Sequence, residues 1–302
     1  MNLRKEDQEL VDLVITSLVS KHTKRAYMRA YRDFFEYWYA KGKPIMNKKF
    51  LLVYKLYLEN EGIEESSMNQ RFCALRKLAN EAVDLEIWNE KVMVDFSRVK
   101  NIPQRGKKTG TWLSKEEVEL LLSKPDFKHL RGKRDQAILS ILIGCGLRRS
   151  ELITLKIDQI QKRDNFWVIG NLLGKRNKTR TVTVPNWVML SIKQYLNNIE
   201  KTSGLLFTRV YGFDHLTNDA LSGNAIWEIV KKYGNACDLD IAPHDLRRTY
   251  AKLSYKFGAK LDQIQLNLGH QSLQTTEVYL GIDLDISDSP GNYLDIQLSP
   301  NM

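Results

Sequence analysis

The chain has 302 residues, 43% of them hydrophobic, and a formal net charge of +10 at pH 7 from 46 Lys and Arg against 36 Asp and Glu. This length exceeds the about 100–200 residues of one ordinary domain, so it predicts two domains, and the hydrophobic content excludes disorder of the whole chain. The three cysteines, Cys73, Cys145 and Cys237, lie far apart without a C-x-x-C pair, which argues against a disulfide framework and a zinc site.

Residues 3–97 read as four or five helices. In the segment Thr23–Ala40, aromatic residues recur at three- and four-residue spacings, which predicts an amphipathic helix with Thr23 as its N-cap. Ser66 or Ser67 is expected to cap a later helix. For this region alone, a helical bundle with solvated charges is the favoured interpretation. Contacts to DNA are the alternative for the basic side chains on the other faces of these helices, Arg25, Arg29 and Arg71.

The best domain boundary lies at residues 98–110, which hold five basic residues, no acidic one, one Pro and two Gly. Such a linker is commonly a solvated hinge, but Lys107 and Lys108 would also suit a strap along phosphate groups. We therefore expect a helical domain at 1–99, a basic linker at 100–112, a second domain at 113–283 and an acidic tail at 284–302.

The second domain should be mostly helical with a small sheet, an α+β fold. Ser114 and Glu117 fit a capping box that begins a helix. An apolar helix follows at Arg134–Cys145, ended by Gly146. Alternating residues predict a hairpin of strands Asn165–Gly170 and Arg180–Val184, joined by a loop at Asn171–Thr179. Further helices are expected at Trp187–Asn198, Asn218–Tyr233, Pro243–Phe257 and Leu261–Leu268.

Four short segments of this domain could carry chemistry, although each is weak alone. Arg148 follows a Gly-Leu pair where a new helix begins near Ser150, so it could face an anion beside backbone N–H groups or pair with Glu151. The segment Gly174–Arg180 at the hairpin loop has four basic residues in seven and lacks the spacing of a phosphate-binding P-loop. Basic turns are usually only solvated.

The other two segments lie near the C-terminus. His244 and Arg247 share a helical face at i and i+3, a pattern that chance alone produces about 0.3 times in such a sequence. His270 follows a glycine, and Tyr279 comes nine residues later. A tyrosine on a terminal helix is usually a packing residue, because a phenol with pKa about 10 is a poor nucleophile unless cations stabilise its anion.

The joint occurrence of these segments in this order resembles the tyrosine recombinase (phage integrase) family, including its Xer-type members. Residues 20–38 also look like the helical core-binding domain of that family. The resemblance implies a nucleophile at Tyr279 and a general acid at Lys175, with Lys178 as the alternative lysine because Arg176 stands where many members have Gly. It implies a phosphate-binding and proton-transfer set formed by Arg148, His244, Arg247 and His270.

On this resemblance the chain should cut and rejoin DNA through a 3′-phosphotyrosine, releasing a 5′ hydroxyl and using neither a metal nor ATP, so no cofactor is expected. The charge agrees with a DNA partner: residues 1–100 carry +3, residues 101–280 carry +11 and residues 281–302 carry −4. The two domains would clamp duplex DNA, with Arg176 and Lys178 as further contacts. The alternatives are a type IB topoisomerase-like nicking and closing enzyme and a non-cleaving DNA-binding regulator.

The expected assembly is a homotetramer on two paired recombination sites, as the resemblance implies. The tail 284–302 could dock on a neighbouring protomer through the apolar residues Tyr293, Leu294, Ile296 and Leu298, or it could be a frayed terminus. No stretch approaches the about 18 apolar residues of a membrane-spanning helix, and the N-terminus lacks a signal-peptide pattern. We expect a cytoplasmic, nucleoid-associated protein from a bacterium, phage or mobile element.

Overall fold

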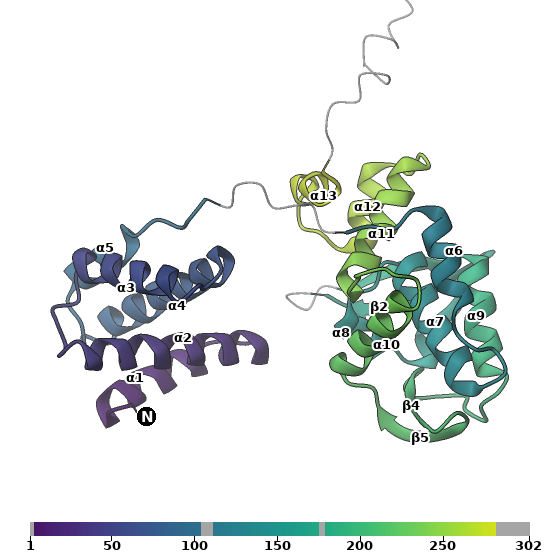
Figure 1. Cartoon of the computed structure of the whole chain (residues 1–302), viewed down its shortest axis with the longest axis horizontal. Coiled ribbons are helices and arrows are strands. Elements are labelled where there is room, and N and C mark those ends of the chain that lie inside the picture. Colours follow the sequence, from purple (N-terminus) through teal and green to yellow (C-terminus); the bar gives the residue numbers. More distant parts are fainter. Residues whose placement is uncertain (1–2, 104–110, 175–178, 282–302) are drawn as a thin grey trace, which may run out of the picture. The chain divides into compact units, whose positions relative to one another are not determined.

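The computed structural model describes residues 3–103, 111–174 and 179–281 (Figure 1). Two compact units make up the chain, Met1–Lys107 and Lys108–Met302, and each has its own hydrophobic core. The division falls inside the basic segment 100–112. Among the described residues, no helix combines the length and the apolar character that crossing a membrane requires.

The first unit is a helical bundle with an aromatic core. Phe34 lies at its centre, with its ring edge-on to those of Tyr54 and Phe96 at centroid distances of 5.3 and 6.0 Å. The helices of its described part are α1 (Lys5–Thr16), α2 (Lys21–Ala40), α3 (Lys48–Asn60), α4 (Glu65–Asp84) and α5 (Glu90–Ser97).

Two of the predicted caps in this unit are wrong. Ser20, not Thr23, caps α2: its hydroxyl accepts the backbone N–H of Thr23, so the helix begins at Lys21. In α4 no side chain caps the N-terminus, and Ser66 and Ser67 lie within the first turn. The spacing of apolar residues located both helices correctly. It does not locate the cap, because the cap is set by the residue at which the backbone leaves helical geometry.

The second unit is mostly helical, and α7 (Leu130–Gly144) is its buried centre, in contact with α9 and α11. The capping box at the start of α6 is confirmed, because Ser114 and Glu117 exchange both hydrogen bonds. The remaining helices are α6 (Lys115–Ser123), α8 (Arg149–Leu152), α9 (Asn186–Leu196), α10 (Gly223–Asn235), α11 (Pro243–Lys256), α12 (Leu261–Leu268) and α13 (Leu273–Leu280), with a 3-10 turn η1 (Ile157–Gln159).

The predicted hairpin is confirmed as β2 (Phe166–Leu173) and β3 (Thr179–Val184), antiparallel neighbours in a sheet of order β1-β2-β3. Three strands were not predicted: β1 (Ile160–Arg163) and the second hairpin, β4 (Thr208–Tyr211) and β5 (His215–Ala220). Most of their residues are polar, so they lack the apolar alternation by which a half-buried strand is recognised.

The helix predicted at Asn218–Tyr233 begins later than expected. Its first three residues belong to β5, and Ser222 caps α10 at Gly223 by accepting the backbone N–H of Ala225. The apolar helix ending before Gly146 begins at Leu130, four residues earlier than predicted. Gly146 has φ +61°, a backbone conformation that favours glycine and turns the chain toward α8.

Candidate active site

Five of the six predicted catalytic residues converge in the second unit. Arg148 is the N-cap residue of α8, His244 and Arg247 lie on the first turns of α11, His270 follows the C-terminal end of α12, and Tyr279 lies on α13. Helices α12 and α13 contact each other, and both contact α11 (Figure 1). The fold thus gathers residues that are up to 131 positions apart in the sequence.

Arg247 is the most buried member, with a relative exposure of 2%. Its two terminal nitrogens donate to the backbone carbonyls of Gly146 and Leu268, so the guanidinium joins the turn after α7 to the end of α12. Burial, followed by the nearby charge of Arg148, lowers the pKa of Arg247 to about 10. It is therefore still a cation at neutral pH.

Arg148 pairs with Glu151, as one of its two predicted interpretations required. The Nη1–Oε1 distance is 2.9 Å, and the backbone N–H of Arg148 donates to Oε2 at 2.8 Å. Nη2 donates to the carbonyl of Gly269 at 3.3 Å, and 26% of the side chain remains exposed. The two interpretations are compatible, because the carboxylate orients a guanidinium that can still reach an anion.

Glu151 was considered only as a partner of Arg148, but it is buried and holds a second arginine as well. Arg180, at the start of β3, donates Nη1 and Nη2 to its two oxygens at 2.7 and 2.8 Å. Burial alone raises the pKa of Glu151, but hydrogen bonds and charge from Arg180 and Arg148 outweigh it, so the pKa falls to about 2. The sequence feature that could have indicated this role is the position of Glu151, three residues after the N-cap residue Arg148 of α8.

His270 is fixed by a neighbour that the sequence did not single out. Its Nδ1 lies 2.9 Å from the hydroxyl of Thr276, which is fully buried on α13. Burial, then the charges of Arg247 and Arg148, lower the pKa of His270 to about 4. The imidazole is therefore neutral at pH 7 in the free protein.

The ring of Tyr279 lies among both histidines and a further arginine. Its centroid is 5.5 Å from that of His244 and 5.3 Å from that of His270, both edge-on, and Arg248 Cζ lies 5.2 Å from it. The hydroxyl donates to the His244 carbonyl at 3.5 Å. Burial raises the pKa of Tyr279 although Arg247 and Arg248 oppose the rise, so the phenol is protonated at neutral pH.

His244 lies at the second position of α11, directly after Pro243. Partial desolvation, then the charges of Arg247 and Arg248, lower its pKa. It is thus neutral at pH 7 and can accept a proton.

The remaining predicted residues divide into two groups. Arg25 and Arg29 are exposed on α2, whereas Arg71 is mostly buried and its Nη1 lies 2.6 Å from the carboxylate of Asp33. An ion pair of this kind favours a structural role for Arg71. Five predicted residues lie outside the described part of the chain: Lys107, Lys108, Lys175, Arg176 and Lys178. Within the described residues, no group of three or more His, Cys, Asp or Glu could hold a metal ion.

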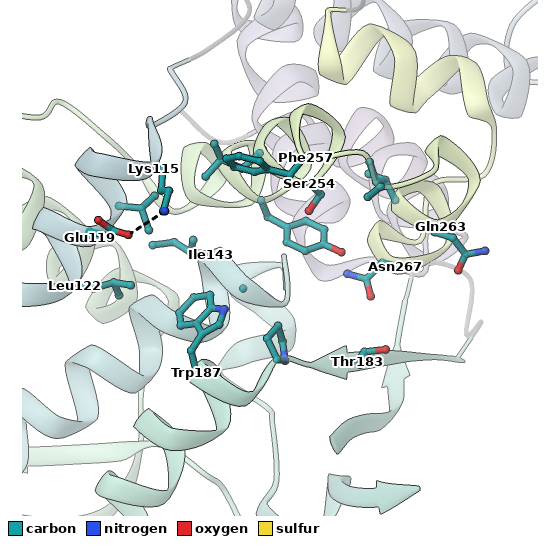
Figure 2. A pocket seen from close by; sticks show the side chains of 17 residues that line it. Lys115, Glu119, Leu122, Ile143, Thr183, Trp187, Ser254, Phe257, Gln263 and Asn267 are labelled. Carbon is teal, nitrogen blue, oxygen red and sulfur yellow. Dashed lines mark ion pairs between the residues drawn. The ribbon is translucent and has the colours of Figure 1, made fainter. Parts of the chain in front are cut away.

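A separate apolar hollow of about 800 Å³ lies in the same unit. Figure 2 shows Trp187, Ile143 and Phe257 around it, with the ion pair of Lys115 and Glu119, 3.8 Å apart, at one side. Residues of α6, α7, β3, α11 and α12 also line it, but none of the five predicted catalytic residues that the structure describes does. Its chemistry suits apolar side chains rather than phosphate.

Comparisons with known proteins agree with this architecture. Residues 111–284 match the phage integrase family and residues 9–98 match the phage integrase SAM-like domain. The tyrosine recombinase XerA of Pyrococcus horikoshii is 31% identical over 261 residues, covering 86% of this chain and 83% of the relative. The tyrosine recombinase XerD of Pseudomonas putida is 31% identical over 198 residues, covering 62% and 63%.

Solved structures share the fold. XerH bound to its palindromic difH substrate superposes with a TM-score of 0.70 at 22% identity, covering 85% of this chain and 76% of that one. A lambda integrase dimer bound to a COC′ core site gives 0.70 at 14% identity, covering 94% and 98%. The predicted α+β fold and the predicted family are confirmed, and the recombinase is favoured over the topoisomerase-like enzyme and the non-cleaving regulator. The chain belongs to the phage integrase family and is an Xer-like tyrosine-type site-specific DNA recombinase.

Proposed function

We propose that Tyr279 cuts DNA by attacking the phosphorus of one phosphodiester bond. The bond from the Tyr279 oxygen to phosphorus forms, the bond from phosphorus to the 5′ oxygen breaks, and Lys175 supplies the proton that this oxygen takes. Arg148 and Arg247 neutralise the charge that builds on the non-bridging oxygens, and His270 donates a further hydrogen bond. The observation that carries this assignment is the position of Tyr279 between His244 and His270, beside buried Arg247.

The raised pKa of Tyr279 requires a base, since the phenol keeps its proton at neutral pH. His244 fits this role, because its lowered pKa keeps it unprotonated at pH 7 and its ring lies edge-on to the phenol ring, with centroids 5.5 Å apart. The proton moves from Tyr279 to His244 as the new bond forms. The phosphotyrosine retains the energy of the broken bond, so a 5′ hydroxyl can rejoin the strand without a nucleotide or a metal.

Covalent trapping tests the assignment. Short duplexes tiled across the flanks of the coding sequence, each nicked so that the cut strand diffuses away, are incubated with the wild type and with Tyr279→Phe. We expect a covalent adduct with the wild type and none with the variant. An adduct that persists in Tyr279→Phe would refute the nucleophile, and its absence with the wild type on every duplex would favour a non-cleaving regulator. Relaxation of plasmids without a specific site would support a topoisomerase.

DNA contacts in this proposal come from both units and are mostly to phosphate. Arg25 and Arg29 are exposed on one helix, and their charges are free to meet a phosphate backbone. Arg71 is left out because Asp33 already neutralises it. The basic segments add Lys107, Lys108, Arg176 and Lys178. A recombinase of this kind would act on chromosomal DNA in the nucleoid.

We further propose assembly as a tetramer on two paired sites, with the tail 284–302 of one protomer held in the apolar hollow of the next. The tail lies outside the described residues, and its sequence holds Tyr293, Leu294, Ile296 and Leu298 together with acidic residues and no basic one. Apolar side chains at this spacing suit the hollow of Figure 2, whose lining includes exposed Phe257. Its acidic character makes the tail better suited to a protein surface than to DNA.

Two variants test this contact: deletion of 284–302 and Phe257→Asp, where the side chain is 67% exposed. We expect both to abolish cooperative occupation of paired sites in gel-shift titrations, while occupation of a single site is retained. Phe166→Asp is the control, because Phe166 is 65% exposed but does not line the hollow. Unchanged cooperativity in the deletion or in Phe257→Asp would contradict the proposed docking.

A further inference from the structure

The C-terminal end of α12 is held by three arginines. Arg180 Nε donates to the carbonyl of Asn267 at 2.7 Å, Arg247 donates to that of Leu268, and Arg148 donates to that of Gly269. The last carbonyls of a helix have no partner within it and carry the negative end of its dipole, so guanidinium groups stabilise them. His270 is the next residue, and its position is set by this end of the helix.

Arg180 differs from the other two because each of its three guanidinium nitrogens donates to a protein group. Its Nη1 and Nη2 are taken by Glu151 and its Nε by Asn267, and only 11% of the side chain is exposed. It stands at the root of the basic hairpin loop, in register with Leu172 on β2. A basic residue beside that loop would ordinarily be read as a DNA contact, but all three guanidinium nitrogens of Arg180 already donate to protein groups, and its side chain is mostly buried.

Glu151 explains what Arg180 does for Arg148. The carboxylate accepts four hydrogen bonds, two from Arg180 and two from Arg148, which uses all its lone-pair positions. One negative charge is thus shared between two positive ones. Without Arg180, the buried carboxylate would be balanced by Arg148 alone, and Arg148 would lose net charge toward a bound phosphate.

We propose that Arg180 is a positioning residue for the recombination chemistry. Through Glu151 it fixes the guanidinium of Arg148, through the carbonyl of Asn267 it holds the last turn of α12 and thus His270, and through β3 it ties both to the β2–β3 hairpin. This inference rests on the proposed function. It assigns Arg180 no contact with DNA or with the reacting phosphate.

The test compares Arg180→Gln and Arg180→Lys with the wild type on a nicked duplex that the wild type cleaves. Because misplacement of reacting groups costs rate rather than binding, we expect Arg180→Gln to slow adduct formation at saturating DNA about 10- to 100-fold, with the half-saturating DNA concentration changed less than about threefold. Arg180→Lys, which keeps the charge but not the two-pronged geometry, should restore part of the rate. Lys162→Gln, at an exposed position of β1, is the control for lost charge.

The pH dependence of the rate of adduct formation is a second measurement, and it would not change if Arg180 only stabilised the fold. Loss of Arg180 removes the largest influence that keeps the pKa of Glu151 low, so the acid limb of the rate profile should shift to higher pH in Arg180→Gln. A wild-type rate and profile in both folded variants would overturn the inference. A raised half-saturating concentration at an unchanged maximal rate would instead make Arg180 a DNA contact. If the wild type forms no adduct, the proposed function fails first, and the two failures are thus distinct.

Discussion

At the scale of single residues, burial moves four pKa values of the site toward the neutral form, and the neighbouring cations add to this shift for His244, His270 and Arg247 but oppose it for Tyr279. The pKa is lowered for His244, His270 and Arg247 and raised for Tyr279. A bound phosphate brings a negative charge into this group and favours the protonated histidines. The same charge makes the phenol harder to ionise, so the proton of Tyr279 should leave only as the new bond forms.

His270 makes the stability of the free protein depend on pH. Its pKa is about 4 in the folded chain against an ordinary value of 6.5, so the unfolded chain binds a proton first as the pH falls. Stability is thus lost between pH 6.5 and 4, and Glu151 adds a further loss below its ordinary pKa of 4.5. We expect thermal midpoints measured at pH 7 and pH 5 to differ less in His270→Gln than in the wild type. The same substitution at exposed His22 should leave the difference unchanged, and an equal difference in all three proteins would contradict this account.

At the scale of secondary-structure elements, the site depends on how α12 ends. Gly269 has φ +63°, and a Cβ atom there would lie 3.2 Å from Arg180 Cδ. The left-handed geometry closes the helix and turns the chain so that His270 faces Tyr279. Because Gly269 has no side chain, the Arg180 side chain has room to pass it and reach Glu151. One glycine thus serves both the turn and the arginine.

Gly269→Ala should therefore lower both stability and activity. The strained φ costs about 1–2 kcal/mol, and the added methyl group displaces Arg180. Gly258→Ala is a matched control, because Gly258 has φ +87° but no atom within 4 Å of the position that a methyl group would take. We expect similar losses in the free energy of unfolding for both variants, and a slower rate of adduct formation at saturating DNA for Gly269→Ala alone. Equal rates in the two variants would show that the contact with Arg180 does not matter.

At the scale of the whole molecule, charge decides how the chain meets DNA. Residues 101–280 carry +11, but Arg180 of this region is committed to internal contacts with Glu151 and Asn267. Net charge therefore overstates the number of cations available to phosphate. The first unit has a smaller excess, and there Arg25 and Arg29 are exposed while Arg71 is paired.

Salt dependence separates these cases. Each phosphate contact contributes about −0.9 to the slope of log affinity against log salt concentration, so Arg25→Gln and Arg29→Gln should each reduce the slope by about 1. Arg71→Gln removes the same charge but should leave the slope unchanged, since Asp33 already neutralises it. Fluorescence anisotropy with the duplex that the wild type cleaves measures the slope for all three variants. A reduced slope for Arg71→Gln, or none for the other two, would show that exposure does not identify the contacts.

The sequence by itself determined much of the secondary structure and the membership of the family. Helical periodicity located α2, α11 and α12, and the Ser114 capping box located α6, because these signals lie within a few neighbouring residues. The order of the Arg, His-x-x-Arg, His and Tyr segments identified the chemistry. Polar strands such as β5 escaped prediction, since they carry no apolar alternation.

Only the tertiary structure decided which groups hold the site together. Arg180 bonds groups 29 and 87 residues away in the sequence, and Thr276 reaches His270 from the next helix, so no local pattern marks either residue. The same is true of the availability of arginines to DNA: nothing in the sequence separates Arg71 and Arg180 from Arg25, yet both are bound to protein groups. The physical reason is that desolvation and hydrogen-bond partners, which set a side chain's charge and freedom, come from packing between elements.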